Sequence, residues 1–167
     1  MNELLYQLRC LWRQRQKEVN NAYQRTLPFA DYVTDRWEKA RMLGFGHGSS
    51  IYDSSLVLGE VSVGENTWIG PFTVLDGTGG LVIGNYCEIS AGVQIYSHDT
   101  VKRATSGGVL PISYSATRIG SRCYLGPNVI VTRGVTLGDG CIIGANSFVN
   151  RDIAPGLKAW GTPCKEV

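Results

Sequence analysis

The sequence contains two histidines, and one of them, His98, stands where a reacting side chain is expected. It lies in the segment Tyr96-Ser97-His98-Asp99, directly before an irregular stretch of chain. A neutral imidazole has a reference pKa of about 6.5 and can act as a general base near neutral pH. Position alone leaves two interpretations open, a catalytic base and an ordinary surface histidine. Asp99 either orients the imidazole ring or is a solvated carboxylate.

The residues that must position His98 follow a six-residue period. An aliphatic side chain returns at every sixth residue in several runs, at Ile51, Val57, Val63, Ile69, Leu75, Ile83, Ile89, Ile95, Ile119, Leu125, Val131, Leu137, Ile143 and Val149. A small or branched residue often follows four places later, as at Ser55, Val61, Thr67, Thr73, Cys87, Val93, Cys123, Val129, Val135, Cys141, Ser147 and Ile153. Neither a helical period of about 3.6 residues nor simple alternation produces this pattern. We interpret each hexad as one short strand and one corner of a coil, with both marked side chains inward and His98 outward.

Glycine follows many of the aliphatic positions, as in Ile69-Gly70 and Leu125-Gly126. We expect these glycines at the corners, where the chain needs a backbone conformation that side chains oppose. With strands about 4.8 Å apart and about three hexads per turn, the coil forms a prism. Cys87, Cys123 and Cys141 fall in the small inward position. They are predicted to be core fillers, because a buried thiol in apolar surroundings resists ionisation.

Two segments interrupt the period. The first, residues 99–118, contains the turn-forming Ser106-Gly107-Gly108, and irregular segments on a regular scaffold are where function usually lies. The second is a slip of two residues around Asp76-Gly77-Thr78-Gly79-Gly80, which should push a small bulge out of one face. We predict that Asp76, at the start of this bulge, binds the substrate.

Residues 1–44 differ in kind from the repeats. Two sets of apolar residues fall on helical faces, Leu4, Leu8, Leu11, Trp12 and Val19 in the first and Val33, Trp37, Ala40 and Leu43 in the second, with Pro28 between them. An uncapped coil would expose strand edges and core at its end. The sequence therefore predicts two helices that cap the coil over residues 1–44, and a coil over residues 45–167 with an excursion at 99–118.

The composition argues against several classes of protein. The formal charge is only +2, and the basic residues form no run of the kind that binds nucleic acid. No uninterrupted apolar segment of the length of a signal peptide core or membrane span occurs, which predicts a cytoplasmic protein. The five cysteines are widely spaced and fit neither a disulfide framework nor a metal site. We expect free thiols and no metal.

The repeats also carry a family resemblance. The segment IGSRCYLGPNVIVTRGVTLGDGCIIGANSFVNRD, residues 119–152, is followed by the closing GTPCK at residues 161–165. It resembles the C-terminal half of bacterial galactoside, maltose and polysaccharide-sugar acetyltransferases, within the hexapeptide-repeat acyltransferases. The resemblance covers roughly residues 45–167. It implies a left-handed parallel β-helix, an exception to the usual right-handed crossover.

The same resemblance implies a chemistry. Its members place a general-base histidine at the position of His98, directly before the excursion. It also implies a homotrimer with acetyl-CoA along the groove between two subunits. Carried over motif by motif, the coenzyme contacts fall on Tyr124, Pro127, Ala145, Asn150, Arg151 and Lys165. Arg151 and Lys165 suit the phosphates of the coenzyme, although both also fit solvated surface charges.

The acceptor is less determined than the donor. The segments TDRWEKARMLGFG, WIGPFTVLDGTGGL and QIYSHDTV resemble acetyltransferases that accompany surface-polysaccharide synthesis, which favours a sugar hydroxyl. Transfer to the amine of an amino sugar needs the same scaffold and base and stays open, as do antibiotic-type and serine acetylation. An acceptor-positioning asparagine of the galactoside and maltose enzymes falls near Gly70 here. The acceptor or its pose is therefore expected to differ.

Two other functions are known for coils of this kind. A zinc carbonic anhydrase needs three histidine ligands, and this sequence has only His47 and His98, which excludes that site. A rigid binding scaffold should show a regular array of like residues on one outer face. The outward positions here are irregular, and that interpretation assigns no role to an excursion with a histidine at its root.

Overall fold

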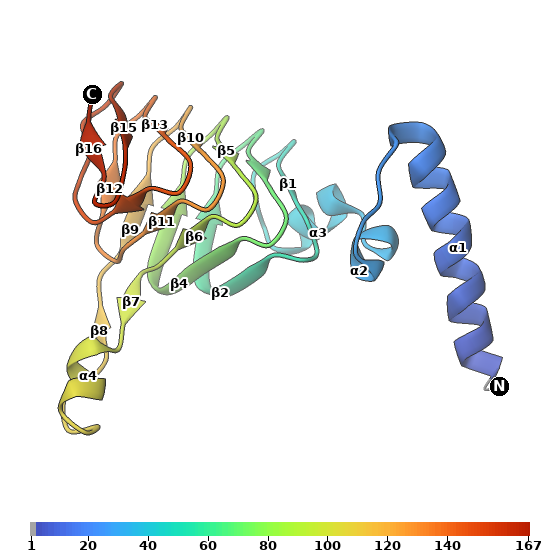
Figure 1. Cartoon of the computed structure of the whole chain (residues 1–167), viewed down its shortest axis with the longest axis horizontal. Helices are drawn as coiled ribbons and strands as arrows, with labels where there is room; N and C mark the ends of the chain where they lie inside the picture. Colours follow the sequence, from blue (N-terminus) through green and yellow to red (C-terminus); the bar gives the residue numbers. More distant parts are fainter. Residues whose placement is uncertain (1–2) are drawn as a thin grey trace.

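Three helices precede the coil in the computed structural model, which describes residues 3–167 (Figure 1). They are α1 (Glu3–Tyr23), α2 (Phe29–Val33) and α3 (Arg36–Met42), where two had been expected. The second expected helix is divided because the side chain of Asp35 caps a new one, accepting hydrogen bonds from Trp37 N at 3.0 Å and Glu38 N at 2.8 Å. Residues 1 and 2 of the predicted cap lie outside the described residues.

The helices differ in how closely they approach the coil. α3 packs on the first strand and buries Ala40, and the following Phe45 is also buried in the coil's core. α1 contacts α2 and has no buried residue, and Figure 1 shows it standing apart from the coil. The short α3 thus closes the end of the coil, while α1 leaves much of its apolar surface exposed.

The coil is built almost entirely from short parallel strands. They are β1 (Ser50–Ile51), β2 (Leu56–Val63), β3 (Trp68–Ile69), β4 (Val74–Ile83), β5 (Glu88–Ile89), β6 (Gln94–Ile95), β9 (Thr117–Ile119), β10 (Tyr124–Leu125), β11 (Ile130–Val131), β12 (Thr136–Leu137), β13 (Ile142–Ile143), β14 (Phe148–Val149) and β15 (Lys158–Trp160). The final strand, β16 (Lys165–Glu166), turns back antiparallel to β15.

The strand register confirms the six-residue period. The predicted inward residues pair from turn to turn in three columns, which are Ile51, Ile69, Ile89, Leu125 and Ile143; Val57, Leu75, Ile95, Val131 and Val149; and Val63, Ile83, Ile119, Leu137 and Ile153. All of them are buried except Val57, which is partly buried against the core near its capped end. Each hexad therefore contributes one side of a three-sided prism.

The cysteines predicted to fill the core do so. Cys87, Cys123 and Cys141 are at most 1% exposed, and each thiol donates a hydrogen bond to a backbone carbonyl of the next turn. The neighbouring thiol of Cys87 and burial raise the pKa of Cys123, and burial raises the pKa of Cys141. The interaction with Cys123 lowers the pKa of Cys87 to about 7, despite its burial.

The expected reason for the repeat glycines is wrong. Gly84 and Gly120 do not have a positive φ, which instead falls two residues later, at Tyr86 (56°) and Arg122 (58°). A Cβ on Gly84 would lie 2.8 Å from the carbonyl carbon of Gly120, and one on Gly120 would lie 2.7 Å from that of Gly138. Glycine is needed because successive turns approach each other too closely for a side chain.

Both interruptions of the period become defined structures. β2 and β4 continue past the prism edge as a paired bulge, with Leu58 opposite Asp76 and a register shift between Gly59 and Val61. The excursion is an arm rather than a loop. It consists of β7 (His98–Asp99), α4 (Val101–Thr105) and β8 (Ser113–Tyr114), with β7 and β8 antiparallel, and it projects from the coil in Figure 1.

Candidate active site

The imidazole of His98 lies against the carboxylate of Asp76. Leu75 pairs with Ile95, so the residues that follow each of them leave the prism side by side at the same edge. Nδ1 of His98 contacts Oδ2 of Asp76 and is 3.0 Å from Oγ1 of Thr78. The bulge and the root of the arm, the two segments that break the repeat, thus meet at His98.

Asp76 is held as a carboxylate by its neighbours. Oδ1 accepts hydrogen bonds from the backbone N–H of Thr78 at 3.0 Å and from its hydroxyl at 2.7 Å, and Oδ2 accepts one from Ser97 N at 3.2 Å. Burial by itself raises the pKa of Asp76, but the hydrogen bonds from Thr78, His98 and Ser97 outweigh it and hold the pKa below its ordinary value. Asp76 therefore presents a negative charge to the ring.

This arrangement selects one form of the imidazole. With Asp76 accepting from Nδ1–H, the lone pair lies on Nε2, which is the form that a general base needs. The side chain of His98 is 29% exposed, and its ring lies 6.2 Å from that of Tyr114 on β8, tilted by 34°. The site is a partly exposed imidazole with a buried carboxylate behind it.

The contacts of the two aspartates differ from the ones that we had predicted. Asp99 does not orient the ring, because its carboxylate is paired with the guanidinium of Arg133 and also accepts from Val101 N at 3.1 Å. The hydrogen bond from Arg133 lowers the pKa of Asp99. Asp76 was predicted to bind the substrate, but its side chain is fully buried and both of its oxygens are engaged within the chain. Asp76 holds the imidazole of His98, and Asp99 links the arm to Arg133 of the coil.

The six residues predicted to contact the coenzyme are exposed but do not form one cluster in the single chain. Pro127 and Ala145 lie one above the other at one edge of the prism, where Asn146 N donates to Pro127 O. Asn150 and Arg151 follow β14 at the edge where His98 follows β6. Tyr124 lies on β10, and Lys165 lies on β16 at the C-terminal end. These residues are distributed over the turns beyond His98.

Arg151 has a structural contact that the sequence did not suggest. Its Nε and Nη2 donate to the carbonyl oxygen of Cys164 at 3.2 and 2.8 Å, which fastens the C-terminal segment to the coil. Only part of the guanidinium is left for a phosphate, so Arg151 is a weaker candidate for that role than the sequence indicated.

Within residues 3–167, no group of three or more histidine, cysteine or carboxylate side chains is arranged to hold a metal ion. Over the same residues, none of the helices combines the length and the apolar character needed to cross a membrane.

A comparison with protein families identifies the type of repeat that forms the coil. Residues 116–151 match the family described as bacterial transferase hexapeptide (six repeats). Over these residues the chain is similar to the hexapeptide repeats of that family. The register of the three columns agrees with this assignment, and the predicted fold, a left-handed parallel β-helix, is confirmed. So is the resemblance to the hexapeptide-repeat acyltransferases.

Curated relatives of the chain include proteins that are named as acetyltransferases. It is 33% identical over 107 residues to the galactoside O-acetyltransferase of Escherichia coli (strain K12), a match that covers 64% of this chain and 43% of the relative. It is 45% identical over 49 residues to the putative acetyltransferase SACOL2570 of Staphylococcus aureus (strain COL), which covers 29% of this chain and 25% of the relative. The matches span less than half the length of these relatives.

Solved structures with the same fold include two acyltransferases. The acetyltransferase domain of PglB from Neisseria gonorrhoeae, in complex with acetyl coenzyme A, has a TM-score of 0.59 at 20% identity, covering 74% of this chain and 50% of that one. AntD, an N-acyltransferase from Bacillus cereus in complex with dTDP and 3-hydroxybutyryl-CoA, has a TM-score of 0.66 at 21% identity, covering 74% and 70%. At these identities the likeness concerns the fold.

Sequence reasoning missed Thr78, Ser97 and Arg133 as members of the site. The hydroxyl of Ser97 accepts from Gly79 N at 2.7 Å, so Ser97 links the arm root to the bulge through both its backbone and its side chain. The signal that could have found these contacts was the two-residue slip. If the six-residue count is resumed after the two extra residues of the slip, Leu75 aligns with Ile95 one turn later. Asp76 then lies beside the segment that begins at Tyr96.

Proposed function

We propose that this chain transfers an acetyl group from acetyl-CoA to a hydroxyl group of a sugar, with His98 as the general base. The observation that carries the proposal is the pair of Asp76 and His98, a half-exposed imidazole whose Nδ1 is held by a buried carboxylate. The match to a galactoside O-acetyltransferase supports the same reaction class.

In the proposed reaction, Nε2 of His98 removes the proton of the acceptor hydroxyl as its oxygen attacks the thioester carbonyl of acetyl-CoA. The C–S bond of the tetrahedral intermediate then breaks, the CoA thiolate leaves, and the imidazolium returns the proton to the sulfur. Asp76 stabilises the imidazolium in between, since its lowered pKa keeps it ionised. General base catalysis of this type typically contributes about 10²- to 10⁴-fold in rate.

We propose that acetyl-CoA extends from His98 over the later turns. Tyr124, Pro127, Ala145 and Asn150 offer exposed surface there, and Lys165 offers a charge for a phosphate. Because these residues occupy different sides of the prism, a groove between two subunits of a homotrimer would bring more of them to one coenzyme than a single chain can. The acetyl-CoA complex of the PglB domain shows that this fold can bind the donor.

The test is a thiol-release assay with acetyl-CoA and a panel of sugars, nucleotide sugars and amino sugars. We expect release of CoA that depends on a hydroxyl-bearing sugar, and His98→Ala should lower turnover by about 100-fold or more while acetyl-CoA binding measured by calorimetry is retained. His47→Ala is the matched control, because His47 is the other histidine and is exposed.

Undiminished turnover in His98→Ala would remove this residue from the mechanism. Release of CoA with amino sugars alone would change the acceptor class to amines. A folded protein that does not bind acetyl-CoA would contradict the donor assignment.

A further inference from the structure

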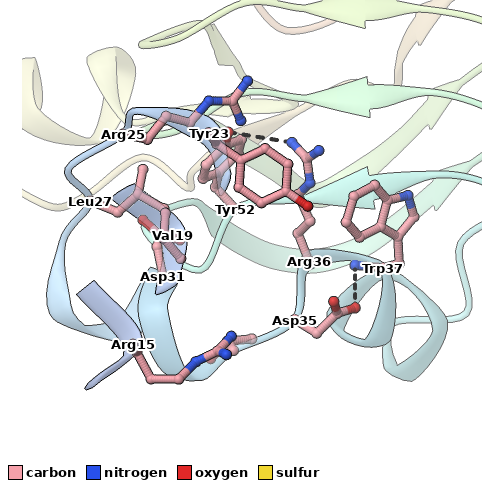
Figure 2. Close-up of a pocket in the computed structure, with 11 residues that line it drawn as sticks. Arg15, Val19, Tyr23, Arg25, Leu27, Asp31, Asp35, Arg36, Trp37 and Tyr52 are labelled. Carbon is pink, nitrogen blue, oxygen red and sulfur yellow. Dashed lines mark hydrogen bonds between the residues drawn. The ribbon is translucent and has the colours of Figure 1, made fainter. Parts of the chain in front are cut away.

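A pocket of about 240 Å³ lies between the helices and the first turn of the coil. Figure 2 shows the side chains that line this pocket. They come from the second half of α1, the segment between α1 and α2, α2, α3, and Tyr52, which directly follows β1. Six lining residues matter for its chemistry, namely Tyr23, Arg25, Asp31, Arg36, Trp37 and Tyr52. None of them belongs to the group around His98, so this pocket is separate from the candidate active site.

One end of the pocket is cationic. Figure 2 shows the guanidinium groups of Arg25 and Arg36 reaching the same end of the cavity. Over residues 3–167, neither of them forms an ion pair, whereas Arg15 at the opposite side is paired with Glu18. Arg36 is half-buried and is positioned by a hydrogen bond of 3.3 Å to the hydroxyl of Tyr52. Two guanidinium groups without carboxylate partners are a binding site for an anionic group.

The walls of the pocket are aromatic. The guanidinium of Arg36 lies 4.2 Å from the ring centre of Trp37 and 5.4 Å from that of Tyr52, and the guanidinium of Arg25 lies 5.8 Å from the ring centre of Tyr23. Cation–π contacts over the rings help to hold the guanidinium groups in place. The exposed rings of Tyr23 and Trp37 also offer flat apolar surface to a ligand.

The pocket also offers a hydrogen-bond acceptor, the carboxylate of Asp31. Its Oδ1 accepts from the backbone N–H of Asp53 at 2.6 Å and of Ser54 at 3.3 Å. Its Oδ2 is buried and has no hydrogen-bond partner among residues 3–167, and the same is true of the hydroxyl of Ser54. A buried carboxylate oxygen left without a partner is costly, and because Asp31 lines the pocket, a ligand hydroxyl that displaces the atoms covering Oδ2 would satisfy it.

We propose that this pocket binds a single anionic sugar unit, a pyranose that carries a phosphate or a carboxylate. The anionic group pairs with Arg25 and Arg36, the ring lies against the aromatic walls, and a ring hydroxyl donates to Asp31. Drug-sized ligands occupy sites of about 300 to 1,000 Å³, so a cavity of about 240 Å³ suits one sugar ring better than a nucleotide. The proposal concerns binding and does not depend on acyl transfer at His98.

Calorimetric titration of the full chain with glucose 1-phosphate, with glucuronate and with neutral glucose tests the proposal. We expect saturable binding of at least one of the two anionic sugars, and the tighter one identifies the anionic group. Arg25→Gln, Arg36→Gln and Asp31→Asn should each weaken it about 10- to 100-fold, since each removes a hydrogen bond that involves a charged group. Because Trp37 lines the pocket, binding should also change tryptophan fluorescence, and Trp37→Phe should abolish most of that change.

The matched control is Arg41→Gln, which removes the same charge from an exposed position of α3 outside the pocket and should leave binding unchanged. His98→Ala should also retain binding, which separates this site from the transfer site. If Arg36→Gln does not fold, as judged by thermal unfolding, Arg25→Gln carries the test because Arg25 is exposed. No saturable binding of either anionic sugar, equal binding of glucose, or an equal loss in Arg41→Gln would overturn the proposal.

Discussion

The interior of the coil and its edge at His98 obey different rules. In the interior, every turn repeats the same inward columns, and in-register neighbours such as Ile89 and Leu125 are interchangeable in kind. At the edge, two unlike segments meet, and each polar group has its own partner, as in the contact of Asp76 with His98. The repeat forms a regular frame, and the segments that break the repeat carry the residues of the proposed chemistry.

The largest expected effect concerns the interior. Ile89→Ala should lower the free energy of unfolding by about 2 to 5 kcal/mol, because Ile89 is fully buried between Ile69 and Leu125 and its loss leaves a cavity. The measurement is denaturant unfolding followed by circular dichroism. Val57→Ala, at the partly buried position nearest the helices, should lower the free energy of unfolding clearly less than Ile89→Ala does. Equal costs would mean that the columns are not packed more tightly in the middle than at the end.

At the edge, Asp76→Asn should reduce turnover rather than coenzyme binding. The variant keeps the shape of the side chain but loses the charge that selects the Nδ1–H form of His98, and misplacement of a catalytic group can cost about 100-fold. Steady-state kinetics should show a fall in kcat with KM for acetyl-CoA little changed. A fall in stability with normal kcat would instead make Asp76 a structural carboxylate only.

Substitutions at the root of the arm should lower turnover less than substitutions at the contact between Asp76 and the imidazole of His98. Arg133→Gln removes the partner of Asp99 and loosens the root of the arm without touching Asp76, so turnover should fall by less than about 10-fold. Susceptibility of the arm to limited proteolysis should increase at the same time. A loss as large as that of Asp76→Asn would show that the arm, and not only the buried carboxylate, positions His98.

The smallest effect is a dependence of stability on pH. Because the pKa of Asp76 is lower in the folded protein, this carboxylate contributes stability that is complete above its unfolded pKa of about 3.9 and is lost as pH falls through the folded value. The difference in unfolding free energy between the wild type and Asp76→Asn should therefore be constant near neutral pH and shrink under acid conditions. A difference that grows in acid would contradict the lowered pKa.

The six-residue period of the sequence was sufficient to predict the architecture of the coil but not the contacts of His98. Inward columns, buried cysteines and the bulge all follow from counting hexads, because in a coil a fixed period sets both register and burial. The sequence offered only the chain neighbour Asp99 as a possible partner of His98 and did not identify Asp76 as the contact. In the structure, β7 pairs with β8, and the carboxylate of Asp99 meets Arg133 from another turn.

The sequence by itself determined which residues are stacked, because each inward aliphatic must meet its counterpart one turn away whatever the outer surface does. Only the tertiary structure decided the parts of Asp76, Asp99 and Arg133. Their side chains belong to separate turns, and their contacts depend on the direction in which the bulge and the arm leave the prism. The tertiary structure also decided that α1 stands away from the coil with its apolar face exposed. The reason is that α2 and α3 determine how the chain enters the first turn.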